Sequence, residues 1–169
     1  RPDFAEHGYA KGVPMGGDLK QAPTGKSPAF MMQALRDPDG ANLDRIQIVK
    51  GWLDASGETQ EKVYDVAWSD SDSRKVGSDG KVPSVGTTVD EKEATYTNTI
   101  GAPSLTGYWQ DPEFDPKLKA FYYVRVLEIP SPRWLAYDRK NYNLYDVMPK
   151  DLLYSSQERA YASPIWYQP

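Results

Sequence analysis

Two strand-like segments near the end of the chain, separated by a long connector, constrain the fold most. Residues 121–129 read Phe-Tyr-Tyr-Val-Arg-Val-Leu-Glu-Ile, so Tyr122, Val124 and Val126 fall on one face. Residues 158–167 make up the second segment. Paired strands are usually joined by a short hairpin, but here residues 130–157 intervene. The pattern predicts two late strands and an elaborated connection between them.

Further strands are predicted upstream from runs of apolar and β-branched residues bounded by turn signals. They cover residues 30–36, 43–53, 62–69, 94–100 and 105–110. The segments 43–53 and 62–69 alternate and flank a turn at 55–58, which predicts an antiparallel hairpin. The one helix expected is a turn at 149–155, with Pro149 at its first position.

Spaced short strands of this kind predict an all-β fold, an immunoglobulin- or fibronectin-like antiparallel β-sandwich with long loops. In such a sandwich Tyr122 would form a tyrosine corner. Residues 1–28 contain five Gly and four Pro and predict an irregular arm, or a linker from an upstream domain. Residues 29–169 are then the sandwich domain, with a long polar loop at 69–93.

Composition excludes several classes of protein and site. The formal net charge is −4 and no basic block stands out, so nucleic acid is not an expected partner. No apolar run approaches the roughly 18 residues of a membrane-spanning helix. The chain has no Cys, which excludes disulfides, thiolate metal sites and cysteine nucleophiles.

Motifs for catalysis or metal binding do not match. His7 is the only histidine and predicts a surface or packing residue, because hydrolytic metal sites use several ligands. The acidic loop from Asp70 has Lys75 and Lys81 at the sixth and twelfth positions, where a calcium loop needs Gly and Glu. The Gly-rich stretch 12–17 lacks the context of a phosphate loop. We therefore expect no catalytic, cofactor-binding or metal-binding residue in this chain.

Aromatic residues gather in the connector, and this is its most informative property. Three interpretations stay open: the connector folds back on its own domain, it docks on a partner domain, or its rings stack on carbohydrate. Arg133 beside Trp134 adds a cation that could reach an anionic substrate in a neighbouring domain. The candidate interface or ligand-contact residues are Arg133, Trp134, Tyr137, Tyr142 and Tyr145.

Several long motifs along the chain stand out. The first is Gly-Tyr-Ala-Lys-Gly-Val-Pro-Met-Gly-Gly-Asp-Leu at residues 8–19. The others lie at residues 35–52, 63–68, 121–134, 157–160 and 163–167. Together they resemble one bacterial family, domain-of-unknown-function family 3604. The resemblance covers nearly the whole chain and places it in the C-terminal region of the family's longer members.

The resemblance implies a relation to the polymerase and histidinol phosphatase superfamily of metal-dependent hydrolases. The His/Asp metal motifs of that superfamily are not found in this chain, so no catalytic residue is carried over. The expected function is a non-catalytic accessory sandwich of an exported hydrolase, periplasmic or secreted, whose partner is the catalytic domain ahead of it. The alternative is a carbohydrate- or polymer-binding module that uses the loop aromatics.

Overall fold

The computed structural model describes residues 4–21, 23–149 and 151–169. Its largest sheet has the strand order β1-β10-β6-β3-β4, and β9 pairs with β6 beside β10. All of its pairings are antiparallel except that of β1 with β10. The strands are β1 (Asp18–Lys20), β3 (Leu43–Leu53), β4 (Thr59–Trp68), β6 (Ala120–Glu128), β9 (Arg159–Tyr161) and β10 (Ile165–Gln168).

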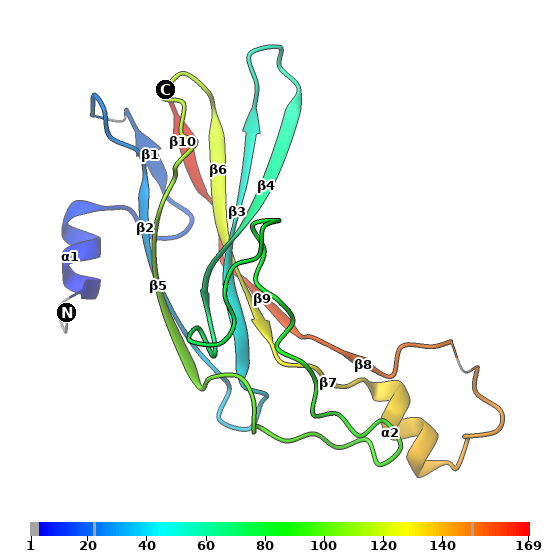
Figure 1. Ribbon diagram of the computed structural model, residues 1–169. Coiled ribbons are helices and arrows are strands. Elements are labelled where there is room, and N and C mark those ends of the chain that lie inside the picture. Colours follow the sequence, from blue (N-terminus) through cyan, green and yellow to red (C-terminus); the bar gives the residue numbers. More distant parts are fainter. Residues whose placement is uncertain (1–3, 22, 150) are drawn as a thin grey trace.

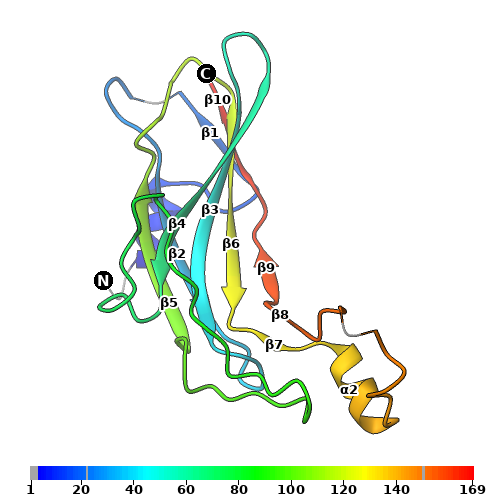
Figure 2. The same ribbon diagram turned by 45° about the vertical axis from the view of Figure 1, so that its right-hand side comes forward.

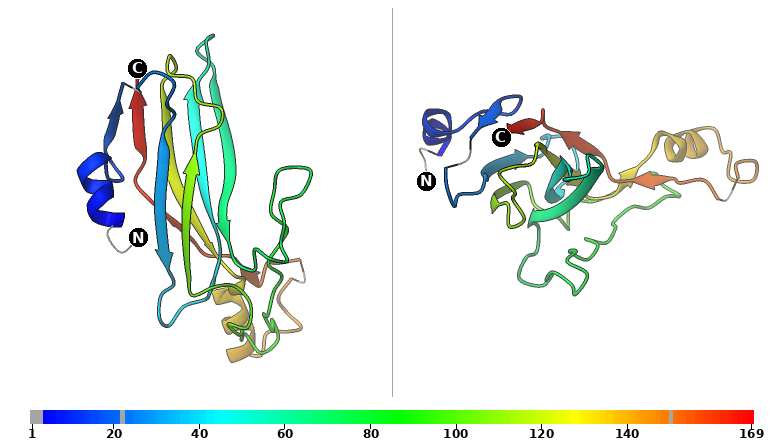
Figure 3. Two further views of the ribbon diagram at one scale, coloured as in Figure 1. Left: turned by 60° about the vertical axis from the view of Figure 1, so that its left-hand side comes forward. Right: turned by 90° about the horizontal axis from the view of Figure 1, so that it is seen from above.

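A second, two-stranded sheet lies across one face of the first (Figure 3). It consists of β2 (Ala29–Leu35) and β5 (Ser104–Gln110). The core fills the space between the two layers: Ile46 and Ile48 of β3 are fully buried and pack in one cluster with Phe30 of β2. The Phe30 ring centroid lies 4.8 Å from that of Tyr122 on β6. The fold is therefore all-β with few helices, as predicted.

Most predicted strands are confirmed, because their alternating patterns place one apolar face on this core. The hairpin of β3 and β4 is also confirmed. The strand predicted at 94–100 is wrong: that segment makes only an isolated bridge between Asp90 and Thr95. The Thr88 hydroxyl takes up both polar groups of the Thr97 backbone, at 2.6 Å to its oxygen and 3.1 Å to its nitrogen, so these groups do not join a strand ladder.

Both helices found in the described residues lie where none was predicted. They are α1 (Phe4–Lys11) and α2 (Trp134–Asn141), whereas the described residues of 149–155 form turns and a short strand. No helix in the described part of the chain is long and apolar enough to span a membrane. The arm 1–28 is less irregular than predicted, since it contains α1 and also β1, which extends the main sheet.

The predicted last strand, 158–167, is split into β9 and β10. Residues 162–164 separate the two, and Pro164 has no backbone N–H to give to a ladder. The Pro164 carbonyl instead accepts a hydrogen bond of 3.1 Å from the Gly16 nitrogen. Both halves still pair with β6, so the break bends the chain along one edge of β6 (Figure 2).

The tyrosine corner predicted for Tyr122 is wrong. Its hydroxyl donates to Asp111 Oδ2 at 2.7 Å and not to a backbone carbonyl. Lys50 lies opposite Tyr122 in the ladder, and its Nζ is 2.6 Å from the same carboxylate oxygen. Lys50 Nζ also donates to the Glu113 carbonyl at 2.9 Å. A buried ion pair and a phenol thus join the two layers at this end of the core.

The polar loop 69–93 has no strand, as predicted, yet its first half is firmly held. Arg74 Nη2 lies 2.6 Å from Asp44 Oδ1, and Arg45 Nη1 lies 2.9 Å from Asp65 Oδ2. Both guanidinium groups donate to the Pro83 carbonyl at 2.8 Å. The loop is therefore fastened to β3 and β4 by buried, charge-assisted hydrogen bonds.

We predict that Lys50→Met lowers the free energy of unfolding by about 3–5 kcal/mol, because it leaves the buried Asp111 carboxylate without a counter-ion. The matched control is Lys62→Met, since Lys62 forms an exposed ion pair with Glu113 and should cost about 0–1 kcal/mol. Urea denaturation of both variants checks the difference. Equal losses in the two variants would contradict a structural role for the buried pair.

Candidate functional site

The connector 130–157 builds a lobe that projects from the end of the sheets (Figures 1 and 2). Its base is the short ladder of β7 (Ser131–Pro132) with β8 (Ser155–Ser156). Helix α2 follows β7, and residues 142–154 return the chain to β8. We call residues 131–156 the α2 lobe. Its two ends are held side by side by β7 and β8, which lets one long connection project without separating β6 from β9.

The α2 lobe has a small core of its own. Ala136 and Tyr154 are buried with Ala94 of the upstream loop, and Leu135 and Met148 pack against them. The Arg139 guanidinium lies 3.6 Å from the Tyr154 ring centroid, which is a cation–π contact with a buried ring. The lobe is therefore ordered by side-chain packing and not only by its covalent ends.

Side chains of the α2 lobe hold the upstream loop 90–95 through hydrogen bonds to its backbone carbonyl groups. Arg139 Nη2 donates to the Glu91 carbonyl at 2.6 Å and Lys140 Nζ to that of Glu93 at 2.8 Å. The Tyr145 hydroxyl donates to the Lys92 carbonyl at 2.8 Å. Charged donors satisfy loop carbonyls that have no strand partner, which explains why two segments distant in sequence fold together.

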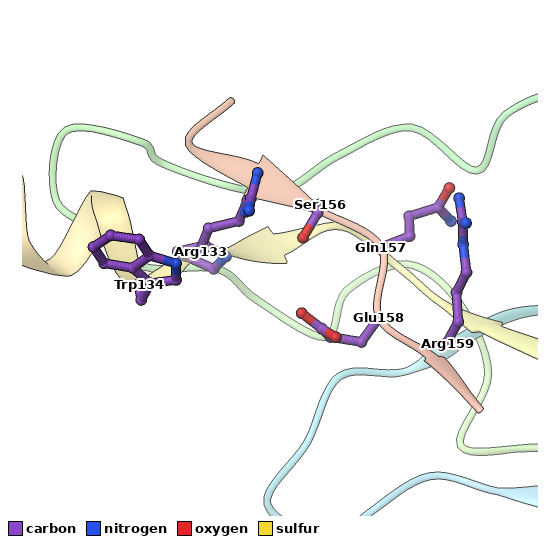
Figure 4. A pocket seen from close by; sticks show the side chains of 7 residues that line it. Arg133, Trp134, Ser156, Gln157, Glu158 and Arg159 are labelled. Carbon is purple, nitrogen blue, oxygen red and sulfur yellow. The ribbon is translucent and has the colours of Figure 1, made fainter. Parts of the chain in front are cut away.

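An open cleft of about 690 Å³ lies where the lobe meets the sheet (Figure 4). Arg133 precedes α2 in an extended conformation, and Trp134 begins the helix with 64% of its surface exposed. On the other strand, Gln157 Nε2 donates to Asp44 Oδ2 at 2.9 Å and to the Glu128 carbonyl at 2.8 Å. The lining residues are Pro132, Arg133, Trp134, Ser156, Gln157, Glu158 and Arg159.

The predicted contact residues separate into three groups in the structure. Arg133 and Trp134 meet in the cleft. Tyr137 and Tyr142 lie exposed on the α2 lobe outside the cleft, Tyr142 with 71% of its surface accessible. Tyr145 is half-buried; it holds the loop and lies beside Arg139, whose Cζ is 5.5 Å from its ring centroid. Sequence reasoning missed Arg159, because only the β7–β8 ladder brings it near Arg133.

At the opposite end of the core, the titratable groups around Asp111 and Glu113 are bonded to one another. Burial and the hydrogen bond to Asp111 raise the pKa of Tyr122, so the phenol stays protonated. Burial and the bond to Glu113 likewise raise the pKa of Tyr64. The Lys62 and Tyr64 hydrogen bonds lower the pKa of Glu113. These groups are paired donors and acceptors, as expected of a structural cluster.

No group of three or more His, Asp or Glu residues that could hold a metal ion occurs within residues 4–21, 23–149 and 151–169. Asp65 accepts hydrogen bonds from Gln47 and Arg45, and Asp111 accepts from Tyr122, so both of these carboxylates are engaged. The geometry of the cleft instead suits non-covalent recognition. It offers an indole face, two guanidinium groups and one carboxylate around an open hollow.

A family model described as Protein of unknown function (DUF3604) matches residues 1–169. The chain belongs to the DUF3604 family. No curated protein and no solved structure matches the chain.

In this DUF3604 chain, one carboxyl group near the cleft, that of Glu128, has a shifted pKa. Burial raises the pKa of Glu128, and the charges of Glu158 and Asp37 raise it further. A carboxyl whose pKa is higher in the folded state binds its proton more tightly there. The free energy of unfolding therefore falls as pH rises from the usual value of 4.5 through the raised pKa.

We predict that Glu128→Gln removes this loss, so the variant gains stability relative to wild type between about pH 4 and pH 7. Urea denaturation over this pH range measures the gain. Glu113→Gln is the control of opposite sign, because the pKa of Glu113 is lowered and its contribution is present at neutral pH. NMR titration should also show a lower pKa for Glu128 in Glu158→Gln. A pH profile of Glu128→Gln parallel to wild type would contradict the prediction.

Proposed function

We propose that this DUF3604 chain is a non-catalytic accessory region of an exported metal-dependent hydrolase, an immunoglobulin-like sandwich that docks on a catalytic domain through the α2 lobe. The resemblance to the C-terminal region of longer family members motivates the partner. The all-β fold and the family match agree with it. The observation that carries the proposal is the lobe itself.

The α2 lobe has the build of a docking element. Its inner side is fixed by packing and by hydrogen bonds to the loop 90–95, whereas several large apolar side chains are exposed on it among polar ones. Large apolar side chains that cluster on a projecting, ordered surface mark an interaction site. They are Trp134, Tyr137, Tyr142, Val147 and Leu153.

The cleft at the base of the lobe supplies the polar part of such a contact. Arg133 lies beside Trp134 there, so a cation adjoins the exposed apolar surface. In the docked state the guanidinium would face an anionic group of the partner or of its bound substrate, with which it can form a bidentate pair. Interfaces of this composition, aromatic with arginine, carry much of their affinity in a few residues.

The alternative is a carbohydrate-binding module that uses the loop aromatics. One observation favours it: Trp134 exposes most of its indole beside a hollow that also presents hydrogen-bonding groups. Against it stands Tyr145, whose hydroxyl is bonded to the Lys92 carbonyl and whose ring is in contact with the Arg139 guanidinium. Trp52 and Trp109 are likewise packed against the core.

Docking is tested by mixing the 169-residue chain with the separately expressed domain that precedes it in a longer family member. Isothermal titration should detect binding, and Trp134→Ser with Tyr142→Ser should weaken it at least about tenfold, since buried aromatic anchors dominate such interfaces. Hydrogen exchange should show protection of residues 134–153 in the complex.

Tyr108→Ser is the matched control, because this tyrosine is equally exposed but lies on β5, in the smaller sheet. It should bind like wild type. Absence of binding, or binding in which the lobe stays unprotected, would overturn the proposal. Binding of neutral oligosaccharides that is lost in Trp134→Ser would support the alternative.

A further inference from the structure

A row of four aromatic rings lies on the face of the main sheet that points away from the smaller sheet. It runs from Trp166 on β10 through Phe121 and Tyr123 on β6 to Tyr161 on β9. Successive ring centroids are 5.3, 6.4 and 6.2 Å apart. Phe121 and Tyr123 are neighbours on one face of β6, and the other two rings come from the strands that pair with its edge. We call these four residues the aromatic row.

The inner part of the aromatic row packs on the sheet. A Cβ atom at Gly51 would lie only 2.3 Å from Cζ of Phe121, so the absence of a side chain at Gly51 makes room for this ring. Val49, the ladder partner of Tyr123, is buried although it faces outward. The centre of the row therefore stabilises the sheet, as cross-strand aromatic pairs do.

The two ends of the row do more than stabilise the sheet. Trp166 is 46% exposed and Tyr161 is 59% exposed, so both offer ring surface to solvent. A charged residue bounds the apolar strip on either side, because Asp18 and Glu61 occupy the ends of the ladder position that contains Trp166 and Phe121. The exposed surface is thus a narrow strip along β6 rather than a broad apolar patch.

Arginines continue the strip beyond Tyr123. Arg125 follows on the same face of β6 and lies opposite Tyr161, and its Nε donates to Gln47 Oε1 at 2.8 Å. This bond orients the guanidinium and leaves its two terminal nitrogens without a protein partner among the described residues. Arg159 lies two residues before Tyr161 on β9 and leads into the cleft that contains Arg133.

None of these three arginines has a carboxylate within 4.0 Å in the part of the chain that the structure describes. Asp18, Glu61 and Glu158 lie in the same region, so the arginines offer individual cationic contacts beside the exposed rings and not a uniformly positive surface. Guanidinium groups bind carboxylate and other oxyanions through two parallel hydrogen bonds. The strip is complementary to a ligand that carries both apolar faces and anionic groups.

We infer that the aromatic row and its arginines bind an anionic polysaccharide. The C–H face of a pyranose ring packs on the electron-rich face of an aromatic ring, and the exposed rings of Trp166 and Tyr161 at the two ends of the row can each receive a sugar of an extended chain. The carboxylate or sulfate groups of the polymer would meet Arg125 and Arg159. A globular protein is the poorer fit, because a stable interface needs about 800 Å² per partner and this strip is narrow.

This inference does not rest on the docking function proposed above. The aromatic row lies on the strands of the main sheet, whereas the docking surface is the α2 lobe. Only the cleft with Arg133 and Arg159 adjoins both regions. Substitutions in the aromatic row should therefore affect polysaccharide binding without affecting docking, and substitutions in the α2 lobe should do the reverse. Either proposal can be wrong while the other holds.

The test is isothermal titration of the 169-residue chain with a hexamer of polygalacturonate, a hexamer of neutral cellulose and a sulfated dextran oligomer. We expect both anionic probes to bind, with an affinity that falls as the salt concentration rises. The probe that binds more tightly shows whether the strip prefers carboxylate or sulfate groups. The neutral hexamer should bind at least about tenfold more weakly. Tyr161→Ala and Arg125→Gln should each weaken anionic binding by about tenfold, since one lost contact of this kind changes affinity by that order.

Tyr108→Ala, on the smaller sheet, is the matched control and should bind like wild type. Circular dichroism of each variant verifies the fold, and Trp166→Ala gives a second reading if one variant unfolds. The inference is wrong if neither anionic probe binds, if the neutral hexamer binds as well, or if Tyr108→Ala weakens binding as much as Tyr161→Ala. Self-association of the chain that Trp166→Ala abolishes, without glycan binding, would assign the row to a protein contact.

Discussion

The contact among Lys50, Asp111 and Tyr122 is the constraint on which the arrangement of the two layers depends. Lys50 and Tyr122 face each other across β3 and β6, and Asp111 comes directly after β5. A slip of β3 by one residue would turn Lys50 to the other face and leave the Asp111 carboxylate buried without a cation. Few arrangements of these strands satisfy all three groups, so the contact selects the register as well as the packing.

A second buried network, around Asp44, joins separate segments of the chain at the opposite end of the core. Asp44 receives charged donors from Arg45 and Arg74 and an amide donor from Gln157. Gln157 follows β8, so this one carboxylate connects the fastened loop to the base of the α2 lobe. The lobe can project because its point of attachment is rigid.

The two buried networks fix the sheets and the base of the α2 lobe, and each of these parts presents one of the surfaces proposed for recognition. The α2 lobe exposes several large apolar side chains and has its own small core, which suits a contact with another folded domain. The aromatic row is narrow, lies on regular strands and leads to arginines that form no ion pair with the described residues, which suits an extended anionic chain. In a longer protein, one surface would hold a neighbouring domain while the other held a polymer close to it.

The sequence by itself determined the strands whose alternating residues face a core, including β3, β4 and β6, because period-two alternation is a local property of the chain. It also singled out the connector as unusual. It could not place the helix α2, since a short helix with a weak pattern is stabilised here by contacts with the distant loop 90–95. The strand predicted at 94–100 is absent for a similar reason, because the distant Thr88 hydroxyl forms hydrogen bonds with the backbone groups of Thr97 that a strand partner would need.

Only the tertiary structure decided which chemical groups act together. Arg133 and Trp134 were identifiable from sequence, but their neighbour Arg159 lies some twenty-five residues away and reaches them through the β7–β8 ladder. The aromatic row was also hidden, because Trp166, Phe121 and Tyr161 belong to three strands that are brought together only by pairing along β6. Side-chain periodicity fixes which face a residue occupies, whereas strand order fixes its neighbours, and strand order is a property of the whole fold.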